Sequence, residues 1–583
     1  MLIGLLGRLL AAHKGLVLAI VLLQLVQTTA NLLLPTLNAA IIDDGIVGRN
    51  PAAIADFGVR MAVTAAVQVV AAVAACYLGA GLAMEVGRQL RDELFAKVQS
   101  FSSQEVAEFG AASLVTRATN DVAQIQNLAV LVFTMLVAAP AIFLGGIVLA
   151  MQQDLALSGI VVAVVPVLAV IMAVIVRRLV PLYRAGQGLI DRISRVLREQ
   201  IIGANVIRGF VRQDHEIRRF DGANRELTRN NLHSALLVAG MMPMIMLVVN
   251  LSSVAVVWFG GHRIQSGEMR LGALTAFIAY ILQILIAIMM AMFVFMTAPR
   301  AAACAERIRA VLDTAPAIAD GPAPADAGFD GARPGDGTVE FRNVSFAYPG
   351  AEAPVLENVS FTAVPGTTTA IIGATGSGKS TLLNLLPRFL GTTAGQITIG
   401  GRDIRDLPLA TLRGLVALVP QHSYLFSGTL ADNLRMGSPE ATDEELWDVL
   451  TAAQAAGFVR RLPQGLLSPV SQGGTNFSGG QRQRLCIARA LLRRAASVCL
   501  FDDSFSALDY GTDYRLRKAL EPLLRAATVL VVAERVATIV DAGLILVLEN
   551  GRLVAQGTHH ELMESSPSYQ EIAASQLVLE DTP

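Results

Sequence analysis

The sequence has 583 residues, of which 53% are hydrophobic and only 16% are charged, and its mean hydropathy is +0.54. A chain of this length is expected to form more than one domain, and its composition is too apolar for an ordinary soluble protein. The net charge of −1 gives no overall reason to expect nucleic acid as a partner.

Six apolar segments precede residue 300, centred near Leu25, Val70, Val137, Val167, Val248 and Leu285. Each supplies about twenty residues of low charge, enough to cross a hydrocarbon layer of about 30 Å. A buried soluble helix is the alternative for any single segment, but six in succession predict an all-α transmembrane domain, which we place at residues 1–314. Its first stretch, MLIGLLGRLLAAHKG, is expected to be an interfacial amphipathic helix rather than a cleavable signal.

Two long polar connections follow the second and the fourth apolar segments. The longer one, residues 177–233, holds twelve arginines and no lysine. The positive-inside bias places it in the cytoplasm, and both termini with it. Apolar residues repeat at helical spacing in both connections, which indicates helices that continue out of the membrane. We expect residues 113–119 and 205–212 at their tips, in contact with nucleotide domains near Gln421.

Residues 315–337 are rich in Ala, Pro, Gly and Asp and predict a flexible joint. Residues 338–583 have the composition of a soluble α/β domain. There GATGSGKST follows an apolar strand and precedes a helix, as a phosphate-binding loop requires. Its backbone N–H groups would close around the phosphates of ATP, Lys379 would reach the β- and γ-phosphates, and Ser380 would ligate Mg²⁺. The candidate residues of this loop are Gly373, Thr375, Gly376, Ser377, Gly378, Lys379, Ser380 and Thr381.

Two further strings carry chemistry. Asp502 ends the apolar strand SVCLF, where an acid beside such a loop is the usual partner of Mg²⁺. NFSGGQRQR, Asn476 to Arg484, is glycine-rich and opens a helix; a plain helix cap is the alternative interpretation.

FSGGQRQRLCIARALL resembles the signature motif of ATP-binding cassette (ABC) proteins. VSFAYPG resembles their adenine-stacking loop, with Tyr348 as the aromatic residue. LVPQHSYLFSGTLADNL resembles the Q-loop of exporters, which implies that Gln421 contacts ATP and Mg²⁺, and SALD resembles the D-loop, with Asp509. GAASLVTRATNDVAQI and GANVIRGFVRQDHEIRRF resemble the intracellular loops of exporters with the six-helix type IV fold. The resemblance implies one subunit of an actinobacterial-type heterodimeric multidrug exporter in the bacterial plasma membrane.

The chain departs from this family pattern at three positions. Asp503 replaces the catalytic glutamate, Glu534 replaces the switch histidine, and Gln472 stands where exporters commonly carry glutamate. The shorter carboxylate of Asp503 would not reach the attacking water, and Glu534 would repel the γ-phosphate. This site is therefore expected to bind ATP and hydrolyse it poorly.

In the family, the signature motif of one chain completes the site of its partner. Ser478, Gly480 and Gln481 are intact here. We therefore expect a second, non-identical half-transporter as partner, with a slow homodimer as the alternative.

The sequence gives fewer indications of the transported substrate. A methionine-rich group in the fifth and sixth segments, with Phe293 and Phe295, suits adaptable binding of hydrophobic or amphipathic compounds, although packing or lipid contact is the alternative. Its methionines are Met241, Met242, Met244, Met246, Met289, Met290, Met292 and Met296. No acid or base lies deep in these segments, so a small charged substrate has no evident site. An importer with the exporter fold and a nucleotide-gated channel remain alternative functions, whereas the six spans exclude a soluble ATPase acting on DNA or ribosomes.

Overall fold

A computed structural model of the protein describes residues 2–321 and 337–580. The chain divides into two compact units. The helical unit comprises Met1–Lys97 and Ala112–Thr314, and the α/β unit comprises Val98–Ala111 and Ala315–Pro583. Residues 98–111, which the sequence analysis included in the transmembrane domain, thus belong with the α/β unit. Most of the expected joint, residues 322–336, lies outside the described residues.

The described residues contain six helical stretches long and apolar enough to cross a membrane, as the sequence predicted. Each contains one of the six predicted centres. The stretches are Leu2–Val47, Pro51–Gln99, Ala111–Gln153, Ser158–Ile202, Gln213–Gln265 and Leu271–Asp313. Their main helices are α1 (Leu2–Leu10), α2 (Lys14–Ala40), α3 (Pro51–Gln99), α5 (Ala111–Thr116), α6 (Val122–Leu131), α7 (Ala138–Gln153), α8 (Ser158–Ile202), α10 (Gln213–Gln265) and α11 (Leu271–Asp313).

Three π-helical turns interrupt these stretches: η2 (Ile41–Val47), η3 (Arg117–Asp121) and η4 (Val132–Leu136). A π-turn leaves backbone carbonyl groups without their usual helical donors, which is costly in an apolar layer. The Gln24 side chain of α2 meets this need, since its Nε2 donates to the carbonyl oxygen of Phe133 at 2.8 Å. At η3, the fully buried carboxylate of Asp121 accepts hydrogen bonds of 2.6 and 2.7 Å from Arg307 of α11.

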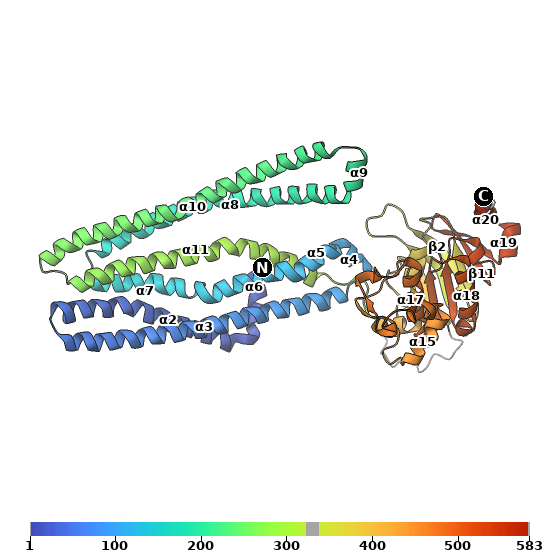
Figure 1. The fold of residues 1–583 in the computed structure, drawn as a ribbon, viewed down its shortest axis with the longest axis horizontal. Coiled ribbons are helices and arrows are strands. Elements are labelled where there is room, and N and C mark those ends of the chain that lie inside the picture. Colours follow the sequence, from blue (N-terminus) through green and yellow to red (C-terminus); the bar gives the residue numbers. More distant parts are fainter. Residues whose placement is uncertain (1, 322–336, 581–583) are drawn as a thin grey trace. The chain divides into compact units, whose positions relative to one another are not determined.

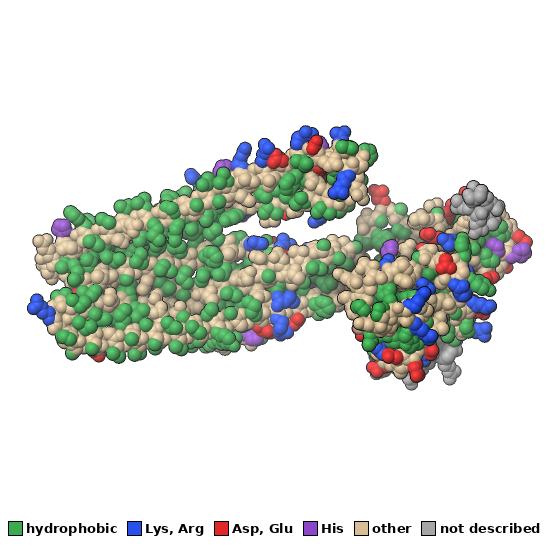
Figure 2. Space-filling model, viewed as in Figure 1, with side chains coloured by type: hydrophobic (Ala, Val, Ile, Leu, Met, Phe, Trp, Pro, Cys, Tyr) green, Lys and Arg blue, Asp and Glu red, His purple; other side chains and the backbone are tan. Residues whose placement is uncertain are grey.

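Helix α11 forms the core of the helical unit. Phe277 and Tyr280 are fully buried, and the Tyr280 hydroxyl donates to the carbonyl oxygen of Leu32 at 3.1 Å. Helices α8 and α10 run antiparallel as a long pair joined by the short α9 (Ala204–Gly209) (Figure 1). Hydrophobic side chains cover much of this unit's surface, and charged ones gather toward the α9 end of the pair (Figure 2). This apolar surface is what a lipid-facing domain requires.

The tip of the first long connection is a separate helix, α4 (Ser103–Phe109). The Ser102 hydroxyl accepts from the amide of Gln104 at 3.2 Å, and the Glu105 carboxylate accepts from the amide of Ser102 at 2.6 Å, so a capping box begins the helix. Gly110, with φ of +76°, ends it. The prediction that residues 113–119 form this tip is therefore wrong, because they lie in α5 and η3. Helix α9 (Ala204–Gly209) does lie at the second tip and overlaps the predicted residues 205–212.

The α/β unit is built on two sheets. A six-stranded sheet has the order β12–β11–β3–β10–β9–β6, in which only the edge strand β12 is antiparallel to its neighbour. A four-stranded antiparallel sheet has the order β2–β1–β4–β5. The strands are β1 (Val339–Phe346), β2 (Leu356–Ala363), β3 (Thr368–Ile372), β4 (Ala394–Ile399), β5 (Arg402–Asp403), β6 (Val416–Val419), β9 (Val498–Asp502), β10 (Thr528–Val532), β11 (Leu544–Glu549) and β12 (Arg552–Gly557), with β7 (Gly428–Thr429) and β8 (Pro469–Val470) as a small separate pair.

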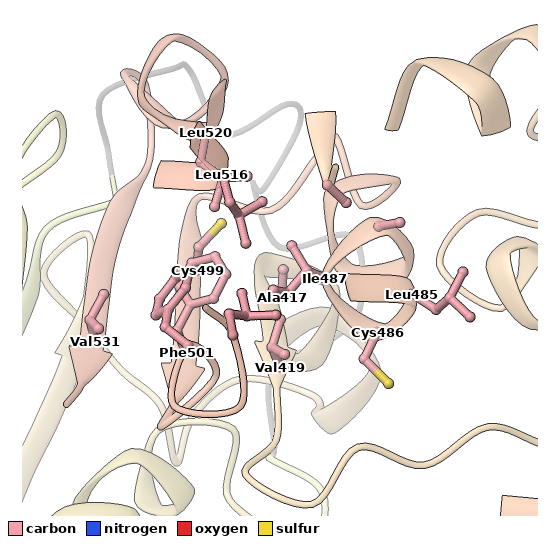
Figure 3. Packing of buried hydrophobic residues seen from close by; sticks show 14 of the residues in the cluster. Ala417, Val419, Leu485, Cys486, Ile487, Cys499, Phe501, Leu516, Leu520 and Val531 are labelled. Carbon is pink, nitrogen blue, oxygen red and sulfur yellow. The ribbon is translucent and has the colours of Figure 1, made fainter. Parts of the chain in front are cut away.

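Helices cover the parallel sheet and bury its continuous apolar strands. Figure 3 shows Leu516 and Leu520 of α18 (Tyr510–Leu524) near Cys499 of β9, and Val419 of β6 near Ile487 of α17 (Gly479–Leu491). All five residues of β9 are buried, as expected for a central parallel strand. The remaining helices are α12 (Lys379–Leu385), α13 (Leu409–Leu415), α14 (Leu430–Arg435), α15 (Asp443–Ala452), α16 (Ala456–Val459), α19 (His559–Ser565) and α20 (Pro567–Glu580).

Candidate nucleotide-binding site

The carboxyl ends of four neighbouring parallel strands bring the predicted site together. The phosphate-binding loop follows β3, Glu534 follows β10, Asp502 ends β9, and Gln421 follows β6. Val532 of β10 pairs with Asp502 on one side and with Ile371 of β3 on the other, so the loops after these strands share one edge. Ligands bind at this edge in open α/β sheets. We call this group of loops the Walker edge.

The loop after β3 wraps around Lys379. Gly376 and Gly378 have φ of +85° and +99°, which favour glycine, and a Cβ at Gly373 would collide with the carbonyl oxygen of Leu548. The Lys379 ammonium donates to the carbonyl oxygens of Gly373 at 2.8 Å and Ala374 at 2.9 Å. The loop thus holds a buried cation at the start of α12, where an anion is favoured.

Burial lowers the pKa of Lys379, and the charges of Glu534, Asp503 and Asp502 oppose this change. Glu534 is the largest of the three opposing influences, so its carboxylate acts on the lysine that would face the phosphates. Glu534 is exposed, and its negative charge lies where the negatively charged phosphates of a nucleotide would bind.

Ser380 and Asp502 form a pair of oxygen ligands beside the loop. The Ser380 hydroxyl donates to Asp502 Oδ1 at 2.8 Å, and the Asp502 side chain is buried. Burial raises the pKa of Asp502, while the Ser380 hydrogen bond and Lys379 lower it. A hydroxyl and a carboxylate in contact fit the oxygen chemistry of Mg²⁺. Gln421 lies at the same edge with an exposed side chain.

Asp503 has an unusual backbone and a half-buried side chain. Its φ is +46°, in the left-handed region, and its amide donates to the carbonyl oxygen of Val532 at 3.1 Å. Burial raises the pKa of Asp503, and the neighbouring Glu534 and Asp502 carboxylates raise it further, against a hydrogen bond from Ser506 and the charge of Lys379. Three carboxyl groups and one ammonium therefore influence one another's charge at the Walker edge.

Tyr348 lies beside the phosphate-binding loop. Its side chain is 44% exposed, its ring meets that of Phe346 edge-on with centroids 4.8 Å apart, and its hydroxyl lies 3.4 Å from that of Thr381. The edge-on contact holds the ring, and its exposure leaves it accessible. This arrangement suits stacking of a flat base.

The signature residues open α17. Ser478 is its N-cap, since the Ser478 hydroxyl accepts from the amide of Gln481 at 3.3 Å while Gln481 Oε1 accepts from the amide of Ser478 at 3.0 Å. Gly480 lies against the carbonyl oxygen of Ala507, where a Cβ would come within 3.1 Å. Asp509 caps α18 through the amide of Thr512 at 2.9 Å, which lowers the pKa of Asp509. The N-terminus of α17 therefore offers exposed backbone donors for an anion, and Arg482 and Arg484 donate to the carbonyl oxygens of Phe477 and Gly480 beside it.

Two family models match the chain: the ABC transporter transmembrane region over residues 17–289 and the ABC transporter model over residues 356–506. An uncharacterized ABC transporter ATP-binding protein of Mycobacterium tuberculosis is 45% identical over 579 residues, which cover 99% of this chain and 98% of that protein. The chain belongs to the ABC transporter family.

Other similar proteins extend this result. The ATP-dependent lipid A-core flippase of Chromobacterium violaceum is 32% identical to the transporter over 569 residues, covering 97% of this chain and 95% of that protein. A solved bacterial Atm1-family ABC exporter with ATP bound superposes with a TM-score of 0.80 at 24% identity, covering 97% and 99% of the two chains. The transporter thus has the ABC exporter fold, a multi-pass membrane domain followed by an ATPase domain, and is ATP-driven.

The sequence analysis missed one contact within the transporter's site. Gln483 Nε2, on the second turn of α17, donates to the carbonyl oxygen of Asp503 at 3.2 Å. The signature helix therefore holds the backbone of the Walker edge in the same chain. The only signal in the sequence is a polar side chain on the buried side of α17, five residues after Ser478.

Proposed function

We propose that the transporter is one subunit of a heterodimer that exports amphipathic or hydrophobic compounds. Its own Walker edge binds Mg²⁺ and ATP with little hydrolysis, and its signature helix completes the catalytic site of a different half-transporter. The observation that carries this proposal is the pair Asp503 and Glu534 at the Walker edge, beside an unaltered signature motif at the start of α17.

Retained binding is supported by the groups that would contact the nucleotide. Tyr348 would stack on adenine, Lys379 and the loop amides would bind the phosphates, and Ser380 with Asp502 would hold Mg²⁺. Bound Mg²⁺ would neutralise phosphate charge. These groups bind ATP without the catalytic glutamate or the switch histidine, so this site can hold ATP and still hydrolyse it poorly.

Poor hydrolysis follows from reach and charge. Asp503 is one methylene shorter than glutamate and lies on a left-handed backbone, and its carboxyl group interacts with Ser506, Glu534 and Asp502. We therefore expect that its carboxylate does not reach the attacking water. A positioned general base contributes about 10²–10⁴-fold, and that contribution is lost when the base cannot reach the water. Glu534 places a second negative charge opposite the γ-phosphate, where a transition state requires donors or cations.

The substrate class is supported by the methionine-rich group. Of this group, Met241, Met289, Met292 and Met296 pack with Met172 of α8 in one cluster formed by α8, α10 and α11. Met242, Met244 and Met246 of α10 remain 42–50% exposed, and Phe293 and Phe295 are more exposed still. Flexible, polarizable side chains adapt to varied apolar ligands. The relatives named lipid A-core flippases suggest a lipid-like compound, moved from a cytoplasmic side that also holds both termini.

The test compares this subunit alone with the subunit purified together with a half-transporter that has glutamate and histidine at the positions of Asp503 and Glu534. We expect the single subunit to hydrolyse ATP at least about a hundredfold more slowly, because both of its sites lack a positioned base. Daunorubicin uptake into inside-out vesicles measures transport by the pair. A homogeneous preparation of the single subunit with turnover equal to that of the pair would contradict the proposal.

A further inference from the structure

The chain that leaves α11 is bound to the α/β unit before it reaches the first strand. We call residues 315–321 the linker strap. Ile318 is 9% exposed, the carbonyl oxygen of Ala319 accepts from Arg388 at 3.1 Å, and Asp320 Oδ1 accepts from the amide of Leu409 at 2.7 Å. The composition placed these residues in a flexible joint, yet each of these contacts fixes the strap to the surface of the α/β unit.

The strap also meets the tip helix α4. Ala317 donates its amide to Glu105 Oε1 at 2.9 Å, a hydrogen bond between residues 212 positions apart. The other carboxylate oxygen, Oε2, accepts from the amide and the hydroxyl of Ser102 at 2.6 and 2.7 Å. Both oxygens of this side chain, which is 3% exposed, are therefore occupied. A capping box alone requires only one of them.

Glu105 is held as a carboxylate. Burial raises its pKa, but the hydrogen bonds from Ser102 and Ala317 outweigh burial, and its pKa is lowered. Hydrogen bonds to a charged acceptor are about twice as strong as neutral ones. The bond to Ala317 is therefore a firm link between α4 and the strap.

Helix α4 also borders a hollow of the α/β unit. Val106 and Ala107 line a shallow hollow with Phe389 and Arg413. Arg413 stacks over the Phe389 ring at 5.3 Å and donates to the carbonyl oxygen of Arg388, the residue that binds the strap. Helix α4, the strap and the segment around Arg388 thus form one closed ring of contacts. In this ring, the hydrogen bond from Ala317 to Glu105 joins α4 to the strap.

We propose that Glu105 is a positioning residue of the transport cycle, which fastens α4 to the linker strap so that the tip helix moves with the α/β unit as one body. Helix α3 ends at Gln99 and α5 begins at Ala111, so a displacement of α4 pulls directly on two membrane helices. If the strap is released, α4 can slip over Phe389 and Arg413, and ATP is hydrolysed without movement of the membrane helices. This inference rests on the proposed transport function.

Two variants remove the hydrogen bond between Ala317 and Glu105, one at the acceptor and one at the donor. Glu105→Ala removes the acceptor, and Ala317→Pro removes the N–H donor while leaving Glu105 and the capping box intact. Ser102→Ala is the matched control, because it weakens the capping box and keeps the bond to Ala317. Glu105→Gln retains an acceptor oxygen without the charge and should restore part of the link.

The first measurement is a distance between spin labels on α4 and α13, at exposed positions 108 and 410, in a variant with Cys76→Ser, by pulsed electron paramagnetic resonance. We expect one narrow distance with and without ATP in the parent and in Ser102→Ala, and a broad distribution in Glu105→Ala and Ala317→Pro. Equal distributions in all four proteins, or broadening in Ser102→Ala equal to that of the two strap variants, would overturn the proposal.

The second measurement is the number of ATP molecules hydrolysed per daunorubicin transported by the assembled pair. In Glu105→Ala and Ala317→Pro this ratio should rise several-fold while ATPase stays within about twofold of the parent, and Glu105→Gln should lie between. A fall of ATPase and transport in equal proportion would show a merely structural role and refute the inference. If the parent pair transports nothing, the proposed function fails, and the label distances still decide whether the strap fixes α4.

Discussion

The Walker edge and the N-terminus of α17 differ in the charges they would present to a phosphate. At the Walker edge, the charges of Asp502, Asp503 and Glu534 act on the single ammonium of Lys379, whose charge burial already disfavours. The N-terminus of α17 has no carboxylate in its cap, since Ser478 is paired with the neutral amide of Gln481. This difference is what we expect of a subunit that, as proposed above, is a poor catalyst at its own nucleotide and completes the catalytic site of its partner.

The largest effect should come from Ser478→Arg. A bulky cation at the N-cap of α17 would prevent closure over the partner's nucleotide and remove donors that act on the transition state. Loss of one such donor costs about 10²–10³-fold in turnover, so ATPase of the assembled pair should fall at least that far. Ser565→Arg, on the exposed side of α19, controls for the added charge. If the assembled pair with Ser478→Arg keeps the ATPase activity of the parent, the N-terminus of α17 does not take part in hydrolysis at the partner's site.

A smaller effect is expected from Lys379→Ala. Loss of the ammonium that the loop encloses should reduce ATP occupancy of this chain's own site by at least about tenfold, because its bonds to phosphate are charge-assisted. Labelled-nucleotide binding measures this in a pair whose other site is disabled. Lys518→Ala, an exposed lysine on α18, is the matched control. Occupancy equal to that of the control would mean that the Walker edge holds no ATP at all.

Asp503→Asn should have the smallest effect. It removes a charge from a site that, in our proposal, contributes little hydrolysis, so steady-state ATPase of the pair should change by less than about twofold. Asp541→Asn, an exposed aspartate, controls for expression and charge. If Asp503→Asn lowers ATPase activity more than Ser478→Arg does, the Walker edge of this chain is itself the catalytic site, and our proposal is wrong.

The sequence predicted the six membrane stretches and the phosphate-binding loop because each is a continuous local signal. An apolar run such as residues 155–176 and the string GATGSGKST need no knowledge of distant residues. The error at the first loop tip was avoidable, since Ser102 and Glu105 have capping-box spacing. The bonds from Gln483 to Asp503 and from Ala317 to Glu105 were not predictable, because a side-chain hydrogen bond over 20 or 212 positions depends on how complete elements pack.

The left-handed backbone at residue 503 has an evolutionary consequence. Among non-glycine residues, aspartate and asparagine adopt this conformation far more readily than glutamate, because their short side chains can hydrogen-bond locally. Restoring glutamate would lengthen the reach toward water and add backbone strain. Stability and hydrolysis thus select different residues at one position. If a partner performs the chemistry, as we propose, selection for a stable fold alone would retain aspartate, and the division of labour between the two subunits would be hard to reverse.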